Sequence, residues 1–257
     1  MRICAAQLAA VRGDIAANVG RHVAFVELAA SHGAELVLFP ELSLTGYEPT
    51  LARELATDAH DPRLGMLQAL ADARSVIIGA GLPTRSKSGP QVSLIVFRPL
   101  AGRLTYSKQR LHADELSWFS SGDEQLVIDA GGHRLAPAIC FESLQPEHAA
   151  AVADLGADTY LASVAKPHRG VELARQHYPS IARRHSMIVL MANCVGPCDD
   201  FVGAGGSAAW TERGQLAAEL PEHDEGIVLI DTTTGEAVAI PGSPPNTGRT
   251  NGSTPDA

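Results

Sequence analysis

The sequence contains no run of about 18 apolar residues, the length that a helix needs to cross a membrane. We therefore predict no membrane-spanning helix and no membrane partner. Basic residues are also in deficit, because 20 Lys and Arg stand against 29 Asp and Glu and give a net charge of −9. An acidic surface disfavours binding to nucleic acid or to anionic membranes.

Cysteine is scarce as well, with four in 257 residues. The first eight residues read as a strand and are too short and too strand-like for a signal peptide. Without an export signal, so few cysteines suggest reduced thiols, and we expect a cytoplasmic location. Cys194 and Cys198 form a C-x3-C pattern with no second pair of ligands, which is poor spacing for zinc. We expect these two thiols to pack in a loop and to bind no metal.

Residues 1–235 contain no internal repeat and no linker rich in Pro and Gly. A chain of this length fits one large α/β domain better than two small ones, so we predict a single domain over 1–235. Residues 241–257 are rich in Pro, Gly, Ser, Thr and Asn, and we predict a disordered tail there.

Short apolar runs alternate with helical patterns, which is typical of a layered α/β architecture. The spacing of apolar residues predicts helices over 17–30, 62–74, 146–155 and 171–186. It predicts strands over 2–8, 35–39, 76–79, 91–97, 104–107, 125–129, 133–139, 159–164, 187–193, 207–210, 215–220 and 226–231.

Cys140 follows directly on the predicted strand 133–139, and a helix is predicted to begin near Pro146. A strand, a sharp turn and a helix expose a nucleophile at the end of a sheet and direct backbone N–H groups to the same point. A thiol in that place can attack a carbonyl or nitrile carbon once a neighbouring group takes its proton. Cys140 is therefore the candidate nucleophile.

Three charged residues are candidates to support this thiol. Glu41 follows a buried strand and Pro40, where loss of solvent raises the pKa of a carboxylate toward the range of a general base. Lys108 ends a strand and is able to stabilise an oxyanion, and Glu115 is able to orient Lys108 or a substrate group. Taken singly, each is equally readable as an ordinary solvated side chain, and Glu41 also as a helix cap.

Taken in order, these segments strongly resemble the nitrilase superfamily of carbon–nitrogen hydrolases, over roughly residues 1–231. Several separated motifs in the right order make the resemblance specific, and it implies a four-layer α-β-β-α sandwich. The motifs are Ala6-Gln7, Phe39-Pro40-Glu41 with Gly46-Tyr47, Tyr106-Ser107-Lys108, Glu115 with Phe119 and Gly122, Ile139-Cys140-Phe141-Glu142 with Pro146-Glu147, Ala182-Arg183, Asn193 with Val195-Gly196, Gly206-Ser207, and Gly214.

The resemblance implies that Cys140 is the nucleophile, Glu41 the general base and Lys108 the third catalytic residue. Glu115 matches the second glutamate of the family site, and the backbone N–H of Phe141 would hold the oxyanion together with Lys108. The implied reaction cleaves a small linear amide to a carboxylate and ammonia, or an amine, through a thioester, with no cofactor and no metal. The family also implies a homodimer or a higher homo-oligomer.

Two other functions stay open on the sequence. One is hydrolysis of a nitrile at the same cysteine, and the other is a non-catalytic regulatory protein that keeps the fold. A Cys–His pair is a rival reading of the nucleophile, with His112 and His168 as its nearest histidines, but the Glu and Lys pattern leaves no need for one.

The loop Lys166-Pro167-His168-Arg169 is basic although the chain is acidic overall. It follows the strand 159–164 and lies where related enzymes place substrate contacts, so we predict that Lys166 meets a negative or strongly polar group of the substrate. His168 and Arg169 are further candidates, and an ordinary basic loop is the alternative. The residues after Cys140 lack the arginine with which some amidases of the family hold a substrate carboxylate.

Overall fold

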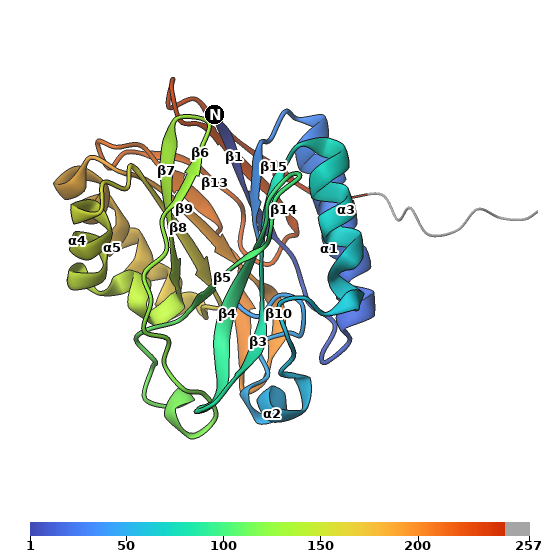
Figure 1. Cartoon of the computed structure of the whole chain (residues 1–257). Coiled ribbons are helices and arrows are strands. Elements are labelled where there is room, and N and C mark those ends of the chain that lie inside the picture. Colours follow the sequence, from blue (N-terminus) through green and yellow to red (C-terminus); the bar gives the residue numbers. More distant parts are fainter. Residues whose placement is uncertain (245–257) are drawn as a thin grey trace, which may run out of the picture.

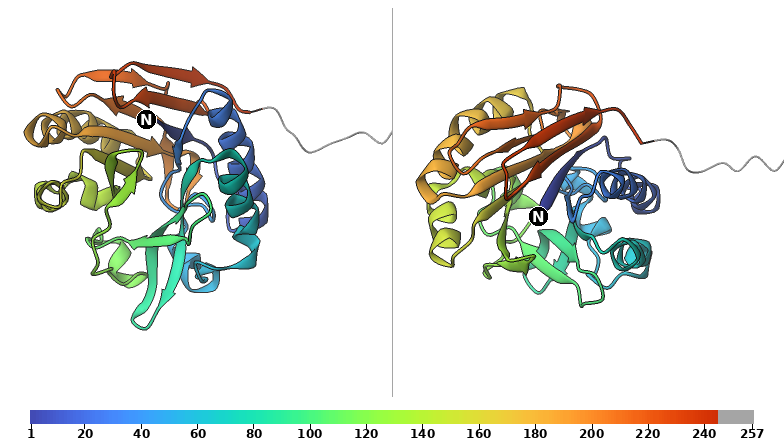
Figure 2. Two further views of the ribbon diagram at one scale, coloured as in Figure 1. Left: turned by 45° about the horizontal axis from the view of Figure 1, so that its top comes forward. Right: turned by 90° about the horizontal axis from the view of Figure 1, so that it is seen from above.

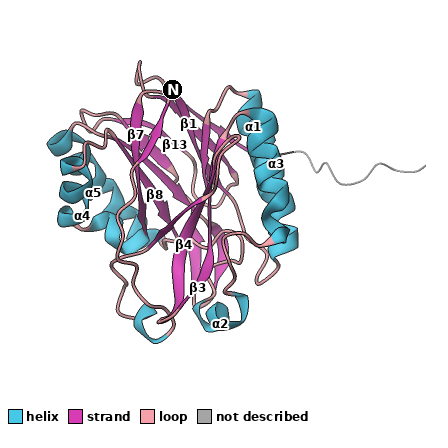
Figure 3. Cartoon of the chain, in the orientation of Figure 1, coloured by secondary structure: helices cyan, strands magenta, loops and turns pink. Residues whose placement is uncertain are grey.

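The computed structural model describes residues 1–244, which form two β-sheets packed face to face with helices on both outer faces (Figures 1 and 3). The view from above in Figure 2 shows the four layers in succession. The predicted α-β-β-α sandwich is thus confirmed. The helices are α1 (Ile15–Ser31) and α3 (Gly65–Arg74) on one side, α4 (Pro146–Asp154) and α5 (His168–His185) on the other, and the short α2 (Ala52–Leu55).

The two sheets are both of mixed type. The first has the order β15 (Ala237–Pro241), β14 (Gly226–Asp231), β1 (Arg2–Gln7), β2 (Leu36–Leu38), β3 (Ile77–Ser86), β4 (Gly89–Phe97) and β5 (Leu104–Ser107). The second has the order β13 (Leu216–Glu219), β12 (Ala208–Trp210), β9 (Ile188–Asn193), β8 (Thr159–Val164), β7 (His133–Ile139) and β6 (Ile128–Ala130). A separate hairpin joins β10 (Val195–Cys198) to β11 (Phe201–Ala204).

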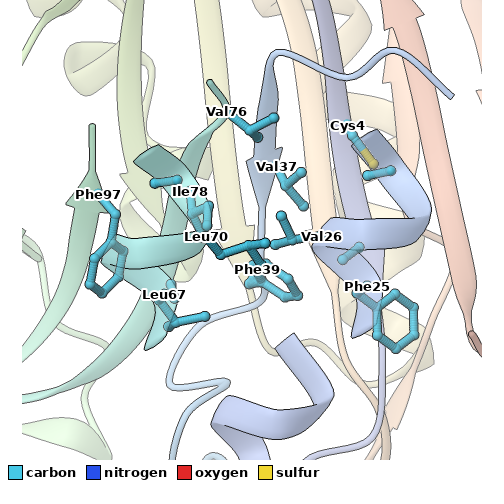
Figure 4. Close-up of a cluster of buried hydrophobic side chains, with 14 of the residues drawn as sticks. Cys4, Phe25, Val26, Val37, Phe39, Leu67, Leu70, Val76, Ile78 and Phe97 are labelled. Atoms are coloured by element: carbon cyan, nitrogen blue, oxygen red, sulfur yellow. The ribbon is translucent and has the colours of Figure 1, made fainter. Parts of the chain in front are cut away.

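Both faces of the first sheet are buried. Alternate residues of a strand point to opposite sides, so each strand contributes to two apolar clusters. In β1, Ile3 and Ala5 face the second sheet, whereas Cys4 and Ala6 face the helices. Figure 4 shows the helix side of this sheet, where side chains of α1 and α3 meet those of the strands. The labelled residues there are Cys4, Phe25, Val26, Val37, Phe39, Leu67, Leu70, Val76, Ile78 and Phe97.

The second sheet repeats this arrangement. Leu161 and Leu190 belong to the apolar interface between the sheets, and their chain neighbours Tyr160 and Val189 belong to the cluster under α4 and α5. The central strands β2, β8 and β9 are therefore mostly apolar, as expected of strands covered on both faces. Among residues 1–244, no helix combines the length and apolar character needed to span a membrane.

The structure contains elements that the sequence did not predict and changes the ends of others. The short helix α2 was not predicted, β3 extends to Ser86 instead of ending at residue 79, and α5 begins at His168 instead of residue 171. Residues 237–241 form β15, which pairs antiparallel with β14, so the first sheet runs past residue 235, where the predicted domain ends. Residues 195–204 form the hairpin β10–β11, which the sequence reasoning missed. Both segments are short: β15 has five residues and ends in a proline, and the hairpin contains Gly196, Pro197 and Gly203, which read as loop residues. Of the predicted tail 241–257, residues 245–257 lie outside the described residues.

Gly81 in β3 lies against the turn that follows β2 and carries Glu41. A Cβ atom at Gly81 would lie 2.4 Å from the backbone nitrogen of Leu42 and 3.0 Å from the carbonyl oxygen of Pro40. The Gly81 carbonyl also accepts a hydrogen bond from the Leu44 N–H at 2.9 Å. The missing side chain therefore lets the turn dock directly on the strand.

We predict that Gly81→Ala lowers the free energy of unfolding by about 1–3 kcal/mol, because the added methyl group forces the turn away from β3. Gly20→Ala in α1 is the control, since a Cβ atom there meets nothing within 4 Å. It should leave stability unchanged or raise it by about 1 kcal/mol, because glycine is unfavourable within a helix. Urea unfolding measures both, and equal midpoints for the two variants would contradict the assigned contact.

Candidate active site

Four of the predicted site residues follow the ends of strands, two from each sheet. Glu41 comes after β2 and Lys108 directly after β5, whereas Cys140 directly follows β7 and Lys166 comes after β8. The carboxyl ends of strands that run in one direction meet at one edge of a sheet, which is where α/β proteins gather functional groups. The structure brings these four residues together from positions far apart in the sequence.

Lys108 lies buried between two carboxylates. Its Nζ atom donates a hydrogen bond of 2.8 Å to Glu41 Oε1 and one of 2.7 Å to Glu115 Oε1. None of the three residues is more than 2% exposed. Glu115 is held in turn by the hydroxyl of Tyr47 at 3.1 Å and the backbone N–H of His112 at 2.7 Å. An ammonium carries three N–H groups, so Lys108 keeps one for a further acceptor.

Burial dominates the electrostatics of this cluster. It raises the pKa of Glu41 to about 7, although the Lys108 ammonium lowers that pKa and Glu115 raises it further. Burial alone would lower the pKa of Lys108, but the Glu41 carboxylate and its neighbours raise it above the usual value. At neutral pH Lys108 is therefore charged, and Glu41 is poised to gain or lose a proton, in the direction that the sequence predicted.

Cys140 has a backbone φ of 47°, in the left-handed region that few side chains adopt. It begins a 3-10 helix, Cys140–Leu144, and its thiol contacts the Ala165 carbonyl at 3.6 Å. Within residues 1–244, the buried Oε2 atom of Glu41 has no hydrogen bond of good geometry. The thiol nevertheless lowers the pKa of Glu41, so the two groups are neighbours. Burial, followed by the Glu41 carboxylate, raises the pKa of Cys140 to about 11, so the thiol is protonated at neutral pH.

The Glu142 carboxylate ties the two halves of the site together. Its Oε1 accepts the backbone N–H of Ile139 at 2.7 Å, just before Cys140. Its Oε2 accepts the backbone N–H of Gln109 at 2.7 Å, just after Lys108. Glu142 is one of the motif residues, but this role was not predictable from the sequence, because the contact joins segments more than 30 residues apart.

Lys166 turns into the site and lies 4% exposed, with its Nζ atom 3.8 Å from Cys140 Sγ. Asn193 fixes its backbone on both sides, since Asn193 Oδ1 accepts the Lys166 N–H at 2.8 Å and Asn193 Nδ2 donates to the Lys166 carbonyl at 3.1 Å. His168 and Arg169 are exposed instead, and the His168 ring contacts Glu222. The basic loop is thus split by the start of α5. A substrate contact for Lys166 stays a prediction.

Phe141 is the second residue of the 3-10 helix, a position whose N–H has no acceptor within its own helix. Its ring packs edge-on against His112, whose own ring pairs with Asp114.

Within the described residues, the polar contacts of the Cys140 sulfur go to Ala165 and Lys166, and none goes to a histidine.

Cys194 and Cys198 are buried with their sulfur atoms 3.5 Å apart, and they pack against Ala165, Tyr47 and Phe201. The predicted packing role near the site is confirmed. In the part of the chain that the structure describes, no three His, Cys, Asp or Glu side chains lie together as metal ligands would.

The sequence profile of the carbon–nitrogen hydrolases matches residues 2–240. The chain belongs to this family. Its members hydrolyse carbon–nitrogen bonds, and the buried Glu41 and Lys108 together with the partly exposed Cys140 are consistent with the Glu-Lys-Cys triad of the nitrilase superfamily.

Individual relatives are similar to the chain at low identity. An (R)-stereoselective amidase of Pseudomonas sp. is 29% identical over 85% of the chain and 80% of its own length. An amidase of Nesterenkonia sp. AN1, solved as a cysteine variant with butyramide, superposes with a TM-score of 0.83 at 25% identity over 90% of each chain. The glutamine-dependent NAD(+) synthetase of Rhodobacter capsulatus is 28% identical over 92% of the chain, which spans 44% of that enzyme.

We predict that Lys108→Met lowers the free energy of unfolding by about 3–5 kcal/mol at pH 8, because it leaves two buried carboxylates without a counter-charge. The loss should be smaller at pH 5. Burial raises the pKa of Glu41 above its value in the unfolded chain, and loss of the Lys108 ammonium raises it further. The folded variant therefore keeps a proton on Glu41 that the unfolded chain loses, so its stability falls as the pH rises from the pKa of the unfolded carboxyl toward the raised folded pKa.

Chemical denaturation at the two pH values measures this effect. Lys87→Met, at an exposed turn, is the control and should change stability by less than about 0.5 kcal/mol. A Lys108 variant as stable as this control would show that the ion cluster is not needed to keep the carboxylates buried.

Proposed function

We propose that the protein hydrolyses a small linear amide to a carboxylate and ammonia, or an amine, through a thioester on Cys140. The observation that carries the proposal is the arrangement of Glu41. One of its oxygens is held by Lys108, while the other is buried, has no aligned hydrogen bond from any residue of 1–244 and lies beside a protonated thiol. A carboxylate with a pKa of about 7 in that position is suited to move a proton in both directions.

The chemistry follows from this geometry. Glu41 takes the thiol proton as Sγ attacks the carbonyl carbon, and the remaining N–H of Lys108 and the Phe141 N–H stabilise the oxyanion. Glu41 then gives the proton to the departing nitrogen, which leaves a thioester. A water molecule activated by Glu41 hydrolyses the thioester and frees Cys140. Glu115 keeps Lys108 in place throughout.

The similar proteins support an amide substrate. The Nesterenkonia amidase has been solved with butyramide and with acrylamide added at its active-site cysteine. The 2-oxoglutaramate amidase of Bacillus subtilis is 24% identical over 89% of the chain and 89% of its own length. These relatives are described as amidases, so hydrolysis of an amide is a better-supported proposal than hydrolysis of a nitrile.

We predict that Cys140→Ala lowers ammonia release from short linear amides, beginning with butyramide, by about 10⁴-fold or more, because the covalent step is lost. The fold should be retained, as judged by circular dichroism. Iodoacetamide should alkylate Cys140 of the native protein faster than Cys4, since Cys4 is fully buried and burial raises the pKa of its thiol. Full turnover by the alanine variant would exclude the mechanism. Ammonia release by the wild type from butyronitrile but from no amide would favour the nitrile alternative.

We also predict that kcat/KM rises with pH and levels off above about 7, because Glu41 acts as a base only when it is ionised. Below that pH the rate should fall about tenfold per pH unit. Glu41→Gln should lower the rate and remove the dependence. A wild-type profile that stays flat between pH 5 and pH 9 would assign the proton transfer to another group.

A further inference from the structure

Lys166 places a second ammonium beside the nucleophile, in addition to Lys108. Its side chain is buried, and in the described part of the chain it forms no ion pair with a carboxylate. Among residues 1–244, the one polar contact of its Nζ atom is the Cys140 sulfur, at 3.8 Å. A buried charge without a partner is strongly unfavourable, so this ammonium needs an anion at the site.

The charges around the thiol show why a second cation matters there. Glu41, Glu115 and Lys108 together carry one net negative charge when both carboxylates are ionised, and both carboxylates raise the pKa of Cys140. Formation of a thiolate next to that cluster is unfavourable. Lys166 brings the sum to zero and, together with Lys108, lowers the pKa of Cys140.

We infer that Lys166 is a further catalytic residue, whose ammonium pairs with the Cys140 thiolate at the moment when Glu41 takes the proton. This inference rests on the proposed function in taking Cys140 as the nucleophile. In the step, the S–H bond breaks, the proton goes to Glu41, and the electron pair stays on sulfur within reach of Nζ. The ion pair then lasts until sulfur bonds to the carbonyl carbon.

The backbone contacts of Lys166 favour this role. Asn193 is fully buried and holds the N–H and the carbonyl of Lys166, and the Ala204 N–H also donates to that carbonyl at 3.0 Å. The preceding residue, Ala165, accepts the thiol of Cys140. The segment Ala165–Lys166 therefore positions the S–H group through the Ala165 carbonyl, and it also positions the Lys166 ammonium that would pair with the thiolate.

Other titratable groups also surround Cys140 and have to be kept constant in a test. Each of them either shifts the pKa of the Cys140 thiol or has its own pKa shifted by the charge of Cys140. Besides Lys166 they are Glu41, Glu115, Lys108, Tyr47, Tyr178 and Cys194. His177 of α5 lies near Lys166, and burial, followed by Lys166, lowers its pKa, which favours the neutral imidazole.

Alkylation kinetics test the inference without any amide substrate, so that failure to find a substrate does not affect the result. The rate at which iodoacetamide labels Cys140 is measured from pH 6 to pH 10 in the wild type, Lys166→Met, Lys166→Gln and Lys166→Arg. The absorbance of the thiolate in the ultraviolet gives a second readout. Arg169→Met is the matched control, because Arg169 is exposed on the same loop.

We expect Lys166→Met and Lys166→Gln to label at least about tenfold more slowly at pH 8, which corresponds to a rise of about one unit or more in the pKa of the Cys140 thiol. Lys166→Arg should restore most of the rate, and Arg169→Met should behave as the wild type. The Gln variant keeps the test valid if the Met variant does not fold.

Unchanged labelling in both neutral variants would overturn the inference. If those variants also raised KM for an amide that carries a carboxylate, such as succinamate, but not for butyramide, Lys166 would instead be the substrate contact that the sequence predicted. Slow labelling of the two neutral Lys166 variants, combined with no hydrolysis of any amide by the wild type, would support the ion pair while contradicting the proposed function.

Discussion

The apolar interface between the two sheets sets the geometry on which the rest of the molecule depends. Leu36, Leu94, Leu161 and Leu190 are among the buried side chains that fill it. Face-to-face sheets pack about 10 Å apart because such side chains interdigitate. The strands of one sheet lead to Glu41 and Lys108, and those of the other lead to Cys140 and Lys166, so this layer fixes how far the base lies from the nucleophile. The Glu142 carboxylate then holds the two halves in register at the edge of the sandwich.

The same packing removes the site from water, and burial then controls its charges. Glu41 and Lys108 are almost fully buried, and a buried ion pair gains little stability over an apolar pair of the same shape. These charges are better explained by the proton transfers that they permit than by a contribution to folding. Cys140 is the one member with partial exposure, which suits a group that has to meet a substrate.

The sequence predicted the parts of the site that depend on local order along the chain. Glu41 and Cys140 each follow a mostly apolar run, and Lys108 follows the short strand β5, so strand ends together with the motif order indicated these three residues. The supporting contacts of Tyr47, Asn193 and Glu142 were not predictable, because each joins segments that only the folded chain brings together. Lys166 and His168 are near neighbours in sequence, yet one is buried and the other exposed, because α5 begins between them. For β15 and the hairpin β10–β11, the apolar pattern was too short to read.

The position of β1 has a consequence for how the protein is made. This first strand lies inside its sheet, between β2 and β14, and Arg2 is paired with Asp231. Until residues 226–231 have left the ribosome, one edge of β1 has no partner strand. Contacts between such distant residues slow folding, and an open strand edge in a nascent chain is prone to aggregation. The first sheet is therefore completed only after residues 226–241 have been synthesised, and fragments that end before β14 would lack the strand that pairs with β1.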